Sequence, residues 1–204
     1  MPDYAHAKDV YKVLRESLTP WTAANGFRRV PGTVVGWQKP AGPDQLLRFM
    51  FEGSSRWGDA ETGHSLTGRV QLDPAPGDPA AAPIRQSLFT SCLVRPELDR
   101  LAAIQGAINR RRPALPAQYE QDFHADTLLG LYLRELYDPS PTYEEGAYVP
   151  LSYYAMEDVR EWTQFIIEVL PAVLDRFVAG RTPRPIDTTP AHLKPKWLRN
   201  LGTP

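Results

Sequence analysis

Residues 156–179 read MEDVREWTQFIIEVLPAVLDRFVA, the longest run of helical periodicity in the chain. Apolar residues recur there every three or four positions and form one stripe along a helix: Val159, Trp162, Ile166, Val169, Leu170, Val173 and Phe177. At about 1.5 Å per residue this helix is roughly 34 Å long, enough to cross a small domain. Gly180 ends it, and Pro171 inside it is expected to produce a bend. We therefore expect the rest of the chain to pack against this helix.

The elements before this helix indicate an α+β fold. Periodicity predicts helices over 5–24 and 96–109, a hairpin of 27–30 with 34–38, and strands over 45–52, 64–72 and 148–154. Residues 54–60 and 73–83 have the composition of loops, and 84–94 and 128–137 fit either helix or strand, with strand favoured for 128–133. This order predicts an antiparallel sheet packed against the N-terminal and the long C-terminal helices, with a helical insert.

The totals fit one soluble domain. The 204 residues suggest a single α+β domain over 1–180, followed by a proline-rich basic tail over 181–204. A single cysteine, Cys92, fits a reducing compartment, and we expect it to be a small buried apolar residue. No signal-peptide pattern and no run of 18 apolar residues is seen, so we expect a cytoplasmic protein without a membrane span.

The charges are unevenly distributed. Residues 117–168 hold eleven acidic residues against only Arg134 and Arg160, although the whole chain has a net charge of −1. Glu144 and Glu145 lie between Pro139-Ser-Pro141 and Gly146, so we expect them on an exposed loop, and Asp138, just before that loop, extends the same negative surface. Such a segment would attract a basic protein and repel nucleic acid. These three residues are the predicted partner-binding site.

Few residues suggest chemistry. His64 lies on the apolar face of its predicted strand, where a structural histidine is the favoured interpretation. Asp122, His124 and Asp126 would share one side of a strand, but their spacing matches no known metal motif, so we predict neither a metal nor a cofactor. Residues 110–112 are three arginines that could contact phosphates, although a charged helix end at the surface is favoured.

Three short segments resemble a bacterial family known only as a domain of unknown function, number forty-three-oh-four. These are Tyr11-Lys-Val-Leu14, Leu18-Thr-Pro-Trp21 and Gly26-Phe-Arg-Arg29, and the Leu170-Pro171 pair near the end of the long helix is similar too. The likeness covers residues 1–72 and 148–179, whereas the middle of the chain departs from it. It implies a small sheet-and-helix domain and transfers no catalytic residue. Related small families often serve as immunity proteins for secreted toxins.

Two functions follow as hypotheses. The first is a non-enzymatic protein-binding domain, in particular an immunity protein that neutralises a basic toxin through the acidic segment. The second is a small enzyme with a site around His64 or around Asp122, His124 and Asp126. A third hypothesis, nucleic-acid binding through residues 110–112 and the basic tail, is disfavoured by the acidic segment.

Overall fold

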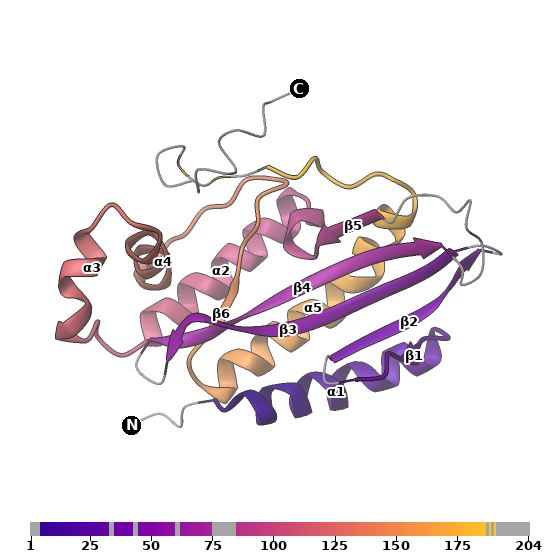
Figure 1. Cartoon of the computed structure of the whole chain (residues 1–204), viewed down its shortest axis with the longest axis horizontal. Helices are drawn as coiled ribbons and strands as arrows, with labels where there is room; N and C mark the ends of the chain where they lie inside the picture. Colours follow the sequence, from indigo (N-terminus) through magenta and orange to yellow (C-terminus); the bar gives the residue numbers. More distant parts are fainter. Residues whose placement is uncertain are drawn as a thin grey trace.

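The computed structural model describes residues 5–32, 35–42, 45–59, 62–74, 85–186, 188 and 190, without the side chains of 54–59. The fold has two layers, an antiparallel sheet and a layer of helices that covers one of its faces (Figure 1). In the helix layer, α5 (Met156–Val178) packs against both α1 (Ala7–Ala24) and α2 (Arg95–Arg111). The predicted organising helix is therefore confirmed and lies at the centre of its layer.

The sheet has the strand order β1-β2-β3-β4-β5, and all neighbours are antiparallel. The strands are β1 (Arg28–Arg29), β2 (Val35–Gly42), β3 (Gln45–Asp59), β4 (Gly63–Pro74) and β5 (Arg85–Leu88). A sixth strand, β6 (Leu151–Tyr153), pairs with the first half of β4, and β5 pairs with the second half. This arrangement confirms the predicted α+β class and the predicted hairpin of β1 with β2.

The core lies between the two layers. Alternate residues of the strands point toward the helices, and Trp37, Phe49 and Phe51 are at most 1% exposed. From the helix side, Trp162 is fully buried and its Nε1 donates to the Ser152 carbonyl over 2.8 Å. The apolar faces predicted for the strands and for the long helix therefore pack against each other between the two layers.

Several predicted boundaries were wrong. Residues 54–59, predicted as a loop, continue strand β3, which pairs with β4 at Ser54 with Ser65 and, after a shift in register, again at Asp59 with Gly63. The ambiguous segment 84–94 contains β5 and then the short 3₁₀ helix η1 (Thr90–Cys92), where Cys92 is fully buried as expected. Helix α1 begins at Ala7 because the backbone of His6 is extended (φ −73°, ψ 139°), and the N–H of Ala5 is bonded to the Tyr154 carbonyl. Most of the loop predicted at 73–83 lies outside the described residues.

The strand favoured for 128–133 was also wrong, because these residues begin helix α4 (Leu128–Tyr137). The Thr127 hydroxyl caps its first turn by accepting from the Gly130 N–H over 3.0 Å. Arg134 holds the preceding turn in place through hydrogen bonds to the Phe123 and Ala125 carbonyls. That turn follows η2 (Ala117–Tyr119) and helix α3 (Glu120–His124), so residues 122–126 form no strand. Within the described residues, no helix is both long and apolar enough to cross a membrane.

Candidate functional site

The predicted partner-binding residues lie in the segment that joins α4 to β6. We call residues 138–149 the acidic loop. Glu144 and Glu145 are exposed, as predicted, whereas Asp138 is half-buried and accepts a hydrogen bond from the Ser140 N–H over 2.9 Å. The predicted location is therefore confirmed for the two glutamates and only in part for Asp138.

Helix α2 binds the backbone of the acidic loop along its length. The buried Asn109 side chain donates to the Asp138 carbonyl over 2.8 Å, and Arg110 donates to the Pro139 carbonyl over 2.6 Å. At the other end of α2, Arg95 donates to the Tyr143 carbonyl over 2.9 Å. Both ends of the helix therefore fix the conformation of the loop.

Close approach to α2 requires a glycine in the helix. A Cβ atom added at Gly106 would lie 2.6 Å from the Pro139 carbonyl oxygen and 3.3 Å from Cδ of Pro141. Glycine is the least favourable ordinary residue in a helix interior except proline. Gly106 is therefore explained by contact with the loop and not by helix stability.

The far side of the loop is tied to two other segments. The Ile186 N–H donates to the Gly146 carbonyl over 3.0 Å, and Ile186 forms an isolated parallel bridge with Ala147. The Val149 N–H donates to the Thr90 hydroxyl over 3.1 Å. The beginning of the predicted tail thus belongs to the folded domain, and residues 187, 189 and 191–204 lie outside the described residues.

Exposed side chains of two kinds meet on this segment. Tyr148 and Ile186 are 40% and 38% exposed, high values for large apolar residues; Tyr148 follows the glutamates in the loop, and Ile186 is bonded to the loop at Gly146. The Tyr148 hydroxyl is hydrogen-bonded to the Thr67 hydroxyl over 2.8 Å, so the ring is held against β4. The loop therefore presents an aromatic residue and carboxylates on a fixed backbone.

The acidic stretch 117–168 does not form one continuous negative surface. Arg111 of α2 binds Asp158 over 2.9 Å and Glu161 over 3.0 Å, and Arg100 of α2 binds Glu168. Each of these three acids therefore has an arginine partner within the fold, two of them sharing Arg111, a pairing that the charge count alone could not reveal. Glu144 differs, because its carboxylate has no cation within ion-pair distance among the described residues.

The residues of the enzyme hypothesis are not brought together. The half-buried His64 lies beside Tyr153, with ring centroids 6.2 Å apart. His124 is exposed and lines a pocket of about 450 Å³ with Glu120, one turn earlier on α3, and not with Asp122 or Asp126. Within the described part of the chain, no three His, Cys, Asp or Glu side chains come together as they would around a metal ion.

The three consecutive arginines do not form a phosphate-binding surface. Arg110 binds the acidic loop, Arg111 pairs with two acids, and Arg112 is only 8% exposed. The expectation of an exposed charged helix end is therefore wrong for Arg112. Arg110 and Arg111 lie on different faces of α2, and Arg112 follows the helix with an extended backbone.

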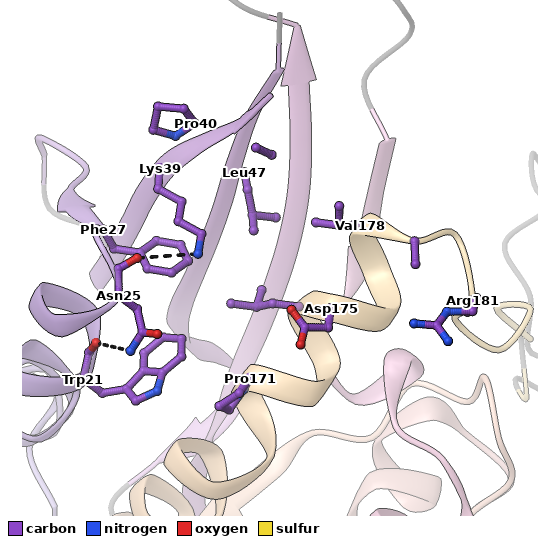
Figure 2. Close-up of a pocket in the computed structure, with 13 residues that line it drawn as sticks. Trp21, Asn25, Phe27, Lys39, Pro40, Leu47, Pro171, Asp175, Val178 and Arg181 are labelled. Atoms are coloured by element: carbon purple, nitrogen blue, oxygen red, sulfur yellow. Dashed lines mark hydrogen bonds between the residues drawn. The ribbon is translucent and has the colours of Figure 1, made fainter. Parts of the chain in front are cut away.

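A second recess lies at the α1 edge of the helix layer, between the ends of α1 and α5 and strand β2 (Figure 2). It measures about 670 Å³, and its apolar lining includes Trp21, Phe27 and Leu174. The Lys39 ammonium lies 4.5 Å from the Phe27 ring centroid, and Asp175 and Arg181 lie on the α5 side of the recess. Among the described residues that line it there is no hydroxyl or thiol nucleophile and no histidine.

Sequence reasoning missed Glu135 on α4. Burial, with a smaller contribution from the Asp138 carboxylate, raises the pKa of Glu135 to about 7. Reading 128–137 as a helix would not have provided the signal, because Gly130, Leu133 and Leu136 define the buried face and Glu135 lies nearly opposite it on the helix.

Comparison with known proteins returned no match among family models, curated proteins or solved structures. The resemblance to the bacterial domain of unknown function stays a prediction.

Proposed function

We propose that the chain is a protein-binding domain that presents its acidic loop to a basic partner protein. The observation that carries this proposal is that the loop is exposed at Glu144, Glu145 and Tyr148 while its backbone is fixed by α2, η1 and Ile186. A segment that is already ordered loses little conformational entropy on binding, so more of its contact energy appears as affinity.

The chemistry of the loop favours a basic protein. Tyrosine is over-represented among the residues that dominate binding energy, because its ring provides a large rigid contact area. Unpaired carboxylates such as that of Glu144 attract a positively charged partner and raise its association rate. A secreted toxin with a basic surface would be a positively charged partner of this kind. It is the class of partner that the immunity-protein hypothesis names.

The test begins with recovery of a partner on immobilised wild-type chain, followed by binding kinetics. Glu144→Lys is expected to slow association on the order of tenfold at low ionic strength, with the difference shrinking at high salt. Tyr148→Ala is expected to raise mainly the dissociation rate, because it removes a contact and not a long-range charge.

The matched control is Glu16→Lys, the same change of charge at an exposed position on α1. Its ion pair with Lys12 spans 4.0 Å between exposed side chains and contributes little to stability. Equal association rates for the two charge reversals, with melting temperatures unchanged, would remove the acidic loop from the proposal.

A further inference from the structure

The recess between the ends of α1 and α5 combines an apolar interior with charged groups at its edge (Figure 2). Three residues of its lining are at most 6% exposed: Phe27, Leu47 and Leu174. Beside them, the half-buried Trp21 has its ring centroid 5.6 Å from that of Phe27. The volume of about 670 Å³ lies within the range of small-molecule sites, which join an apolar lining to a few polar groups. The recess therefore has space for the apolar part of a small molecule.

The charged group on the β2 side is held in place. The half-buried Lys39 ammonium lies 4.5 Å from the Phe27 ring centroid and donates to the Asn25 carbonyl over 3.5 Å. An ammonium group has three N–H donors, so this one bond leaves donors for a further acceptor. Lys39 forms no ion pair with any acid of the described residues. It is therefore a fixed cation that can accept an anionic partner at the recess.

The charge on the α5 side has the opposite sign. Asp175 lines the recess from the last turn of α5, and its exposed carboxylate forms no ion pair within the described residues. Helices α1 and α5 both end at the recess, and a helix C-terminus carries a partial negative charge. The exposed Arg181, which follows α5, offsets part of this charge. Lys39 and Asp175 thus present opposite charges to one recess without pairing with each other.

A ligand with a single charge would be attracted by one of these side chains and repelled by the other. A zwitterion with an apolar body satisfies both and also fills the apolar interior. We propose that the recess binds a free amino acid with a large apolar side chain. Its carboxylate is bound by Lys39, its ammonium by Asp175, and its side chain packs beside Trp21. The site is separate from the acidic loop and does not depend on the proposed function.

Three indole compounds are the probes. L-Tryptophan has both charged groups, tryptamine lacks the carboxylate, and indole-3-propionate lacks the ammonium. Tryptophan is expected to bind the whole chain with a dissociation constant of about 1 mM or tighter, as suits a ligand of its size. It should bind about fivefold more tightly than either analogue, because each analogue loses one ion pair at a partly exposed side chain. Ligand-observed ¹H NMR titrations at neutral pH measure all three constants.

Two substitutions assign the two ion pairs. Lys39→Gln is expected to weaken tryptophan about fivefold, to the level of tryptamine, and to leave tryptamine itself unchanged. Asp175→Asn is expected to weaken tryptophan to the level of indole-3-propionate and to leave indole-3-propionate unchanged. A purely structural effect on the recess would instead weaken all three probes alike. Lys8→Gln, the same change as Lys39→Gln at an exposed position of α1, should alter none of the three constants.

The wild-type series alone decides the question if a variant does not fold. Equal binding of the three probes, or no binding of tryptophan at millimolar concentrations, would overturn the proposal. A folded Lys39→Gln variant that still prefers tryptophan over tryptamine would overturn it as well, because the carboxylate would then have another partner.

Discussion

The carboxylate of Glu145 accepts a hydrogen bond from the backbone N–H of Arg95 over 2.6 Å. Arg95 begins helix α2, so this carboxylate satisfies one of the free N–H groups of the first helical turn. The acidic loop and the start of α2 therefore form one structural unit. The neighbouring Glu144 is exposed in the same way but makes no such contact with the helix.

Substitutions of the two glutamates are therefore expected to affect different properties: stability for Glu145 and binding for Glu144. Glu145→Ala should lower the free energy of unfolding by about 1 kcal/mol, as loss of a capping group does, whereas Glu144→Ala should leave it unchanged. Urea unfolding of the two variants under the same conditions measures the difference. Identical midpoints would show that the contact of Glu145 with Arg95 contributes nothing to stability.

Gly106→Ala provides a second test of the contact between α2 and the acidic loop. On helix propensity alone, alanine should stabilise α2 by about 1 kcal/mol. Because the added methyl would lie 2.6 Å from the Pro139 carbonyl oxygen, we expect a net loss of stability instead. Thermal melts decide the sign, and a rise in melting temperature would mean that the loop can move away from the helix without cost.

The parts of the fold that could be predicted from the sequence are those with long periodic patterns. Helix α5 repeats its apolar stripe over 23 residues, and this repetition outweighs any single exception, including Pro171. Residues 128–133 read LLGLYL, too short and too apolar to distinguish helix from strand. The contacts that favour helix there, the Thr127 cap and the bonds of Arg134 to the α3 turn, are made by residues outside this window.

The candidate site, like the fold, could be predicted from the sequence only in part. Flanking prolines and a glycine predicted that Glu144 and Glu145 would be exposed, and both are. The partner of Glu145 is 50 residues away in the chain, a separation at which local patterns carry no information. Arg112 was misplaced for a related reason, because the packing of α4 and β4 around the end of α2 decides which of three consecutive arginines is buried.

Trp162 tests the central packing between α5 and the sheet. Trp162→Ala is expected to cost about 3 to 5 kcal/mol of stability, as truncation of a large buried side chain does. Trp162→Phe keeps most of the apolar contact but leaves the Ser152 carbonyl without its Nε1 donor, which should cost about 1 to 3 kcal/mol. Denaturant unfolding of both variants separates the two contributions. Wild-type stability in the alanine variant would show that this helix is peripheral.

The raised pKa of Glu135 predicts how the stability of the fold depends on pH. Its pKa in the folded chain is about 7, against an ordinary value of 4.5, so between these values the folded chain holds a proton that the unfolded chain has released. Stability from this group is therefore fully present below about pH 4.5 and is lost as pH rises toward and through 7. The shift corresponds to at most about 3 kcal/mol.

Glu135→Gln removes this titration while keeping the shape of the side chain. The variant should match wild type near pH 4.5 and exceed its stability at pH 8 by at most about 3 kcal/mol, because glutamine has no charge to desolvate. Glu144→Gln, which makes the same change at an exposed position of the acidic loop, is the control for replacing a surface glutamate. Urea unfolding at pH 4.5, 6 and 8 measures all three chains. A difference between Glu135→Gln and wild type that stays constant across this range would mean that Glu135 is solvated in the folded state.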